Sequence, residues 1–144
     1  MKQANPYLNF AGNTEEAFNF YRSIFGGEFL ALVRFREFGE NPMRIPEDEL
    51  DRIAHFALPL GGGNVLMATD TTSGQPRTVG SNVYIALEAD TAEEAGRLFS
   101  GLAAGGRTEM ELQQTQWAEK YGSLVDRYGV QWMVSYTGNV KFRG

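Results

Sequence analysis

The chain has 144 residues, of which 42% are hydrophobic and 22% charged, as in one ordinary globular domain. It contains no cysteine, which excludes disulfides, thiolate metal sites and a cysteine nucleophile. Its net charge of −5 comes without a basic cluster, so we expect no nucleic-acid partner. A single histidine excludes metal sites that need two or three imidazole ligands.

The N-terminal residues lead directly into a short Tyr-Leu-Asn-Phe run and lack the apolar core of a signal peptide. No stretch of the chain approaches 18 consecutive apolar residues. We therefore expect a cytoplasmic protein that has no membrane partner.

The first predicted elements are a short strand, Tyr7–Phe10, and an amphipathic helix. Asn13 is a typical helix N-cap and has Glu16 three residues after it. A glycine pair at 26–27 predicts the end of the helix. The apolar stripe between these signals, spaced i, i+3, i+4, i+7, consists of Ala17, Phe20, Tyr21 and Ile24.

Three more strands are predicted in the first half, over roughly 28–36, 53–60 and 65–68. Three glycines at 61–63 join the last two as a hairpin turn. The insertion 38–52 contains two prolines and five acidic residues, and we interpret it as a solvated acidic loop.

The segment 71–80 is rich in turn-forming residues and predicts a linker, after which the first pattern returns. A strand is predicted over 83–89 and is followed by a cap at Asp90-Thr91 with acidic residues after it. The helix again ends at a glycine pair, 105–106. The apolar stripe lies 78 residues after the first one, at Ala95, Leu98, Phe99 and Leu102.

Strands over roughly 108–112, 121–127 and 130–136 complete the second half, with a turn around Tyr128-Gly129. Each half therefore has the order βαβββ. The predicted fold class is α/β (α+β): two tandem βαβββ modules that form a curved mixed sheet. We interpret residues 1–144 as one domain, with module one over about 1–72, a linker over about 71–80 and module two over about 81–144.

This arrangement resembles the vicinal oxygen chelate superfamily, which includes glyoxalase I, extradiol dioxygenases, fosfomycin resistance enzymes and bleomycin resistance proteins. Within it the chain looks most like the PhnB-like group, often labelled as a 3-demethylubiquinone 3-methyltransferase domain. The resemblance covers nearly the whole chain. The blocks that carry it are Asn5-Pro6-Tyr7-Leu8, Gly12-Asn13 through Phe20-Tyr21, Phe25-Gly26-Gly27, Ala54-His55-Phe56, Trp117 to Tyr121-Gly122, and Asp126 to Trp132.

The resemblance implies where a divalent metal would be held, namely on the first and fourth strand of each module by histidines and glutamates. The first-strand positions fall near Pro6 and Tyr84, and the fourth-strand positions near Met67–Asp70 and Met133. Only Asp70 could bind a cation, so we expect no bound metal and no cofactor.

His55 is the only side chain whose ordinary pKa lies near neutrality, which makes it the candidate for a general acid or base. It sits in a predicted strand among apolar neighbours, where a hydrogen-bonded structural role is the alternative. The methyltransferase label has no support in the residues. A cofactor site of that kind needs a glycine-rich turn between a strand and a helix, and each glycine cluster lies elsewhere.

Aromatic and polar residues suited to a small-molecule pocket occur along the chain. Met67 and Trp132 are interpreted preferentially as core residues. Trp117, among three glutamines, forms either a pocket wall or a cover over the core. The candidates are Tyr7, Asn9, Met67, Gln116, Trp117, Tyr121 and Trp132.

These observations favour a metal-free, PhnB-like protein that binds an unknown small molecule. The predicted ligand-binding residues are Tyr7, Asn9, His55, Asp70, Trp117 and Tyr121. The alternative is an enzyme of the superfamily that uses His55 with a carboxylate such as Asp70 or Glu119, with or without a weakly held divalent ion. The resemblance also implies a homodimer, and a homodimer whose cavity is residual is a third interpretation.

Overall fold

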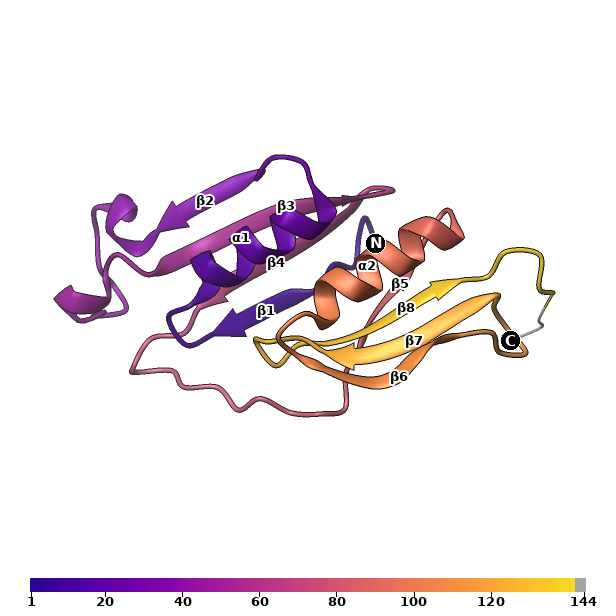
Figure 1. The fold of residues 1–144 in the computed structure, drawn as a ribbon. Helices are drawn as coiled ribbons and strands as arrows, with labels where there is room; N and C mark the ends of the chain where they lie inside the picture. The colour runs from indigo at the N-terminus through magenta and orange to yellow at the C-terminus, as the bar shows by residue number, and fades with distance from the viewer. Residues whose placement is uncertain (142–144) are drawn as a thin grey trace. The chain divides into compact units, whose positions relative to one another are not determined.

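A computed structural model describes residues 1–141 and divides the chain into two compact units, Met1–Thr78 and Val79–Gly144 (Figure 1). The boundary between the units falls inside the segment 71–80 that was predicted as a linker. The last three residues of the predicted second module, 142–144, lie outside the described residues. No helix in the described part combines the length and the hydropathy that crossing a membrane requires.

The first unit contains one helix and one mixed sheet with the strand order β1-β4-β3-β2. β1 runs parallel to β4, and the other neighbouring strands are antiparallel. Two short 3₁₀ helices, Phe35–Phe38 and Glu47–Glu49, lie between β2 and β3. The regular elements are β1 (Tyr7–Phe10), α1 (Thr14–Phe25), β2 (Ala31–Arg34), β3 (Ile53–Gly61) and β4 (Asn64–Asp70).

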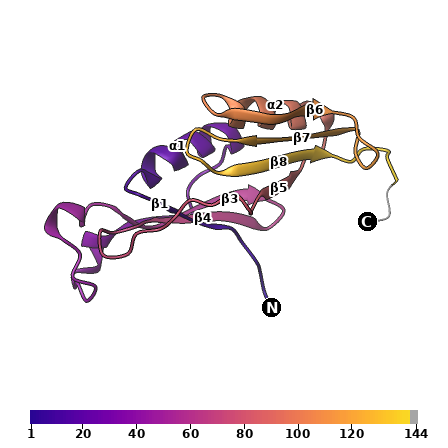
Figure 2. The ribbon, with the colours of Figure 1, turned by 90° about the horizontal axis from the view of Figure 1, so that it is seen from below.

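Helix α1 covers one face of this sheet (Figures 1 and 2). Phe18 and Tyr21 are fully buried on the inner side of the helix, and the Phe18 ring lies 5.1 Å from that of Phe56 on β3. Successive strand residues point to opposite faces, so Leu58 and Leu66 share the covered face with Phe56. The other face of the sheet is left free of α1.

The N-terminus of α1 is capped differently from the prediction. Asn13 makes no side-chain cap hydrogen bond. Instead the carboxylate of Asp70, at the end of β4, accepts hydrogen bonds from the amide of Thr14 at 3.0 Å and from its hydroxyl at 2.6 Å. The predicted C-terminal signal is confirmed, because Gly26 has φ 77° and its amide donates to the carbonyl of Arg22.

The insertion between β2 and β3 is only partly the solvated loop that the charge pattern predicted. Ile45 is 7% exposed and Glu49 is 6% exposed. Glu49 is held by Arg52, three residues later, and by Ser73, which follows β4. The insertion is therefore fixed to the chain segment that follows β4.

The second unit repeats the order of the first, with one helix and a mixed sheet ordered β5-β8-β7-β6. β5 is parallel to β8, and the remaining pairs are antiparallel. Its elements are β5 (Ile85–Glu88), α2 (Ala92–Ala103), β6 (Arg107–Gln113), β7 (Lys120–Val125) and β8 (Gln131–Tyr136).

Helix α2 packs on β6, β7 and β8, and its apolar stripe is buried as predicted. Trp132, Leu124 and Val134 form the fully buried strand side of this core, which confirms Trp132 as a core residue. Gly122 allows the close approach, because a Cβ there would lie 2.7 Å from the ring of Phe99. The indole nitrogen of Trp132 donates to buried Asp126 at 2.9 Å.

The two units confirm the predicted fold class, since each is a βαβββ module. The predicted stripe of α2 is buried throughout, whereas in α1 Phe18 is buried and the predicted Phe20 is only half-buried. The two units also differ in the spacing between the first strand and the helix. The last buried residue before the helix is Phe10 in the first unit, four residues before Thr14, and Ala89 in the second, three residues before Ala92. The longer connection of the first unit contains Gly12, whose φ of 98° is a conformation that favours glycine.

Candidate functional site

The face of the first sheet that α1 leaves free, called here the open face, carries two of the predicted site residues in contact. Tyr7 on β1 and His55 on β3 flank β4, and the Tyr7 hydroxyl lies 3.0 Å from Nδ1 of His55. Their rings are stacked with centroids 5.7 Å apart. His55 precedes Phe56, which faces α1, so the strand alternation turns its ring to the open face.

Partial burial raises the pKa of Tyr7 above its ordinary value of 10.0. The hydroxyl therefore keeps its proton at neutral pH and can donate it to Nδ1 of His55. The pair thus places a phenol hydroxyl beside an imidazole ring, which suits recognition of a polar planar molecule.

A cleft of about 200 Å³ lies at the Asn9 end of the first sheet. Asn9 follows Tyr7 by two residues on β1 and pairs with Thr69 on β4, so both side chains share the open face with the Tyr7 and His55 rings. The lining combines polar and apolar side chains with one cation and one carboxylate: Asn9, Phe35, Met43, Thr69, Asp70, Thr71, Thr72, Gln75 and Arg77.

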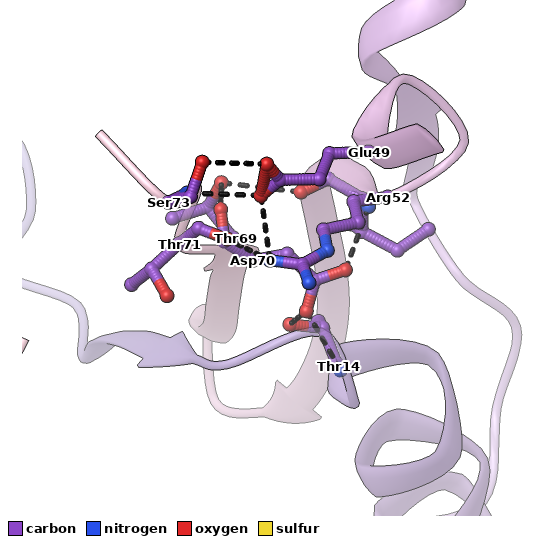
Figure 3. A network of polar contacts seen from close by, with 8 residues as sticks. Thr14, Glu49, Arg52, Thr69, Asp70, Thr71 and Ser73 are labelled. Carbon is purple, nitrogen blue, oxygen red and sulfur yellow. Dashed lines mark hydrogen bonds and ion pairs between the residues drawn. The ribbon is translucent and has the colours of Figure 1, made fainter. Parts of the chain in front are cut away.

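A polar network holds the rim of this cleft in place (Figure 3). The carboxylate of Glu49 accepts hydrogen bonds from the amide and the hydroxyl of Ser73 at 2.9 and 2.8 Å. Arg52 lies 3.1 Å from Glu49 and donates to the carbonyl of Thr71 at 2.9 Å. The Ser73 hydroxyl and amide hold the pKa of Glu49 below its usual range, so Glu49 is ionised at neutral pH.

Asp70 belongs to the cleft lining, but its carboxylate is already in use. One oxygen accepts from both donors of Thr14, and the other accepts from the amide of Ile53 at 2.8 Å. The side chain is 3% exposed. Asp70 therefore joins α1, β3 and β4, and no contact links it to His55, whose hydrogen-bond partner is Tyr7.

The remaining predicted site residues, Trp117 and Tyr121, lie together in the second unit. Their rings meet edge to face with centroids 5.2 Å apart. Trp117 is 40% exposed. On the same unit the Tyr84 hydroxyl donates to Glu109 at 2.6 Å, and this carboxylate raises the pKa of Tyr84.

Sequence reasoning missed several residues of the first-unit cleft. Phe35 was placed in a strand, Met43 in a solvated loop, and Arg77 in a linker. Arg77 is unusual because it is a charged residue in a segment made mainly of turn-forming residues. The sequence shows this charge, but it does not indicate which strands the segment contacts.

The residues at the metal positions implied by the superfamily resemblance do not fit a divalent ion. Pro6 offers no side-chain ligand, and the Tyr84 hydroxyl donates to Glu109. Met133 has a soft thioether, and both oxygens of Asp70 are hydrogen-bonded. Within residues 1–141 no group of three or more His, Asp or Glu side chains is arranged to hold a metal ion.

Comparison with known proteins decides the family. The profile of the Glyoxalase/Bleomycin resistance protein/Dioxygenase superfamily matches residues 3–134. The chain belongs to this superfamily. The superfamily match extends through both βαβββ units, from β1 into β8.

Individual relatives cover almost all of the chain. Protein YjdN of Escherichia coli (strain K12) is 32% identical in an alignment of 141 positions that covers 91% of this chain and 92% of YjdN. The crystal structure of protein PA1353 from Pseudomonas aeruginosa is 40% identical and has a TM-score of 0.81, with 93% of this chain and 96% of that one covered. The PhnB protein from Bacillus cereus is 28% identical, with a TM-score of 0.74 and coverage of 93% and 98%. The chain is thus PhnB-like within its superfamily.

Proposed function

We propose that this PhnB-like protein binds a small molecule on the open face of the first sheet, and that it does so without a divalent metal. The observation that carries the proposal is the Tyr7–His55 pair, in which the hydroxyl and Nδ1 are 3.0 Å apart, on the same face as the Asn9 and Thr69 side chains of the cleft. Concave sites that combine apolar walls with a few polar groups are typical of small-molecule binding.

Two further features support this proposal. Tyr7 is 46% exposed, and its hydroxyl hydrogen-bonds to another side chain of the open face instead of a backbone carbonyl. The rim of the cleft is held by the Glu49–Arg52–Ser73 network, so the site is largely formed before a ligand arrives.

The experiment is a thermal-shift screen of the purified protein against aromatic and aliphatic metabolites of each charge type, with and without EDTA. A ligand that binds only the folded state raises the Tm, by the equivalent of about 2.7 kcal/mol at one hundred times its Kd. We expect the shift to survive EDTA and elemental analysis to find no stoichiometric zinc, iron or nickel. A shift that requires a metal contradicts the metal-free proposal.

The residues are tested with Tyr7→Phe, which keeps the ring and removes the hydroxyl. A lost hydrogen bond to the ligand or to His55 weakens binding by up to about tenfold. His55→Ala removes the ring as well and weakens binding further. Tyr128→Phe, in the turn between β7 and β8, is the matched control and leaves the affinity unchanged. Equal affinity in all three variants means that the ligand binds elsewhere.

The homodimer that the resemblance implies remains a proposal. We expect multi-angle light scattering at micromolar concentration to give about 32 kDa, twice the 16.0 kDa of one chain. A mass of about 16 kDa across the concentration range identifies a monomer. The binding proposal does not depend on this outcome, because the open-face residues named above belong to one unit.

A further inference from the structure

The cleft of the first unit contains an arginine that forms no ion pair with a carboxylate of residues 1–141. The first unit has six arginines, and four of them pair with a carboxylate within 4.0 Å. Arg77 is not among these four. In the described part of the chain its guanidinium bonds only the backbone carbonyls of Gln75 and Pro76, both at 3.3 Å. Arg77 is exposed and lines the cleft, so a ligand can reach its charge.

The other charged residue of the lining, Asp70, does not cancel Arg77. Its two oxygens accept three hydrogen bonds from Thr14 and Ile53, and it faces the N-terminus of α1, where the helix dipole favours negative charge. The charge that the cleft offers to a ligand is therefore positive, although the chain as a whole carries −5.

The remaining lining residues define the rest of the ligand. Phe35 is half-buried and Met43 is 53% exposed, so both present apolar surface. Asn9 and Gln75 add amide groups that can donate or accept hydrogen bonds. The volume of about 200 Å³ corresponds to about seven water molecules, which restricts the ligand to a molecule smaller than a typical drug.

We propose that this cleft binds small monocarboxylates that carry a short aromatic or aliphatic group. The carboxylate pairs with the guanidinium of Arg77, whose planar fork matches the two carboxylate oxygens. The apolar group lies against Phe35 and Met43. This inference rests on the proposed function and names the ligand class of that site.

The test measures binding of phenylacetate, phenylacetamide and phenethylamine to the full chain by titration calorimetry at low ionic strength. The three probes share one ring and differ in charge. We expect phenylacetate to bind, phenylacetamide to bind at least about tenfold more weakly, and phenethylamine not to bind. Phenyl phosphate serves as a fourth probe, because binding that is stronger than that of phenylacetate identifies a phosphate site and overturns the carboxylate assignment.

The matched variants are Arg77→Gln and Arg44→Gln. Arg44 is an arginine of the same unit that lies outside the cleft lining and has no carboxylate within 4.0 Å in the described chain. Both variants remove one positive charge, so a general electrostatic effect weakens both alike. We expect Arg77→Gln to lose at least about tenfold in affinity for phenylacetate, and Arg44→Gln to bind as the unmodified chain does.

Besides stronger binding of phenyl phosphate, three results overturn the inference. Equal affinity for phenylacetate and phenylacetamide means that charge is not recognised, and an unchanged affinity in Arg77→Gln means that this residue does not recognise it. In both cases small-molecule binding itself stands. If phenylacetate does not bind at all, the ligand class is wrong, and the metabolite screen with Tyr7→Phe decides the proposed function separately.

Discussion

The two units have the same order of elements and hold their helices in different ways. The N-terminus of α1 is capped by Asp70, which lies 56 residues after Thr14 in the sequence. The N-terminus of α2 is capped by its own neighbour, because the Thr91 side chain accepts from the amide of Glu94 at 3.0 Å. A repeated fold therefore does not imply repeated interactions. In the first unit the cap also connects the helix to the strands that carry the candidate site.

The buried aspartates show the same difference. Asp126 of the second unit accepts from the amides of Tyr128 and Val130, and from the indole of Trp132. All three donors lie within six residues of it, so Asp126 organises one turn and one core side chain. Asp70 instead joins three separate elements. The contacts of Asp70 are therefore long-range in sequence, whereas those of Asp126 are local.

Replacing Asp70 with Ala tests most directly how much the stability of the first unit depends on this aspartate. The substitution removes three hydrogen bonds to a charged acceptor and leaves the Thr14 hydroxyl and the Ile53 amide buried without that partner. We expect a loss of about 3 kcal/mol in the free energy of unfolding, measured by urea denaturation. Asp48→Ala, at an exposed aspartate of the same unit, is the control and changes stability by less than about 0.5 kcal/mol. A loss as small as that of the control would show that the Asp70 contacts are dispensable.

A smaller loss of stability is expected from the N-cap residues, which can be compared at equivalent positions of the two helices. Thr91→Ala removes the side-chain acceptor at the start of α2, and we expect it to cost about 1 kcal/mol. Asn13→Ala, at the equivalent position before α1, removes no cap hydrogen bond and changes stability by less than about 0.5 kcal/mol. Both values come from urea denaturation. Equal losses for the two variants mean that Asn13 also caps its helix in solution.

The smallest expected effect concerns acid stability of the first unit. Ser73 lowers the pKa of Glu49 from its ordinary value of 4.5, so the ionised carboxylate is favoured in the folded state. Its stabilising effect is fully present above pH 4.5 and disappears as the pH falls through the lowered pKa. We expect the Tm of Glu49→Gln to fall less steeply below pH 4.5 than that of the unmodified chain. Glu40→Gln, at an exposed glutamate of the same insertion, keeps the original slope. Parallel curves for Glu49→Gln and the unmodified chain would contradict this role.

Much of the fold was predictable because its signals are local. The apolar stripes, the terminal glycines and the alternating strands each lie within a few residues, and all of them correspond to elements of the structure. The order βαβββ followed from reading these signals in sequence. The beginning of α1 shows the limit, since Asn13 has the right residue type and neighbours for a cap. The competing acceptor, Asp70, is near only after β1 and β4 have paired.

The candidate site was less accessible to sequence reasoning for the same physical reason. Tyr7 and His55 were each chosen for their chemistry, but their contact depends on both strands flanking β4. The burial of Glu49 depends on Ser73, which lies 24 residues away, and local charge density does not indicate that contact. Arg77 carried no motif, and its place in the cleft follows from the path of the chain after β4.

The position of Asp70 also bears on the order in which the first unit folds. The hairpin of β3 and β4 closes through a three-glycine turn and needs only local contacts. The parallel pairing of β1 with β4 must close a loop of dozens of residues, which costs more chain entropy. We therefore expect this pairing to form late in folding. Because the Asp70 cap requires that pairing, the first turn of α1 gains its cap only when the sheet is complete. The amide of Thr14 is therefore a reporter of sheet closure, whereas the amide of Glu94 reports only on its own helix.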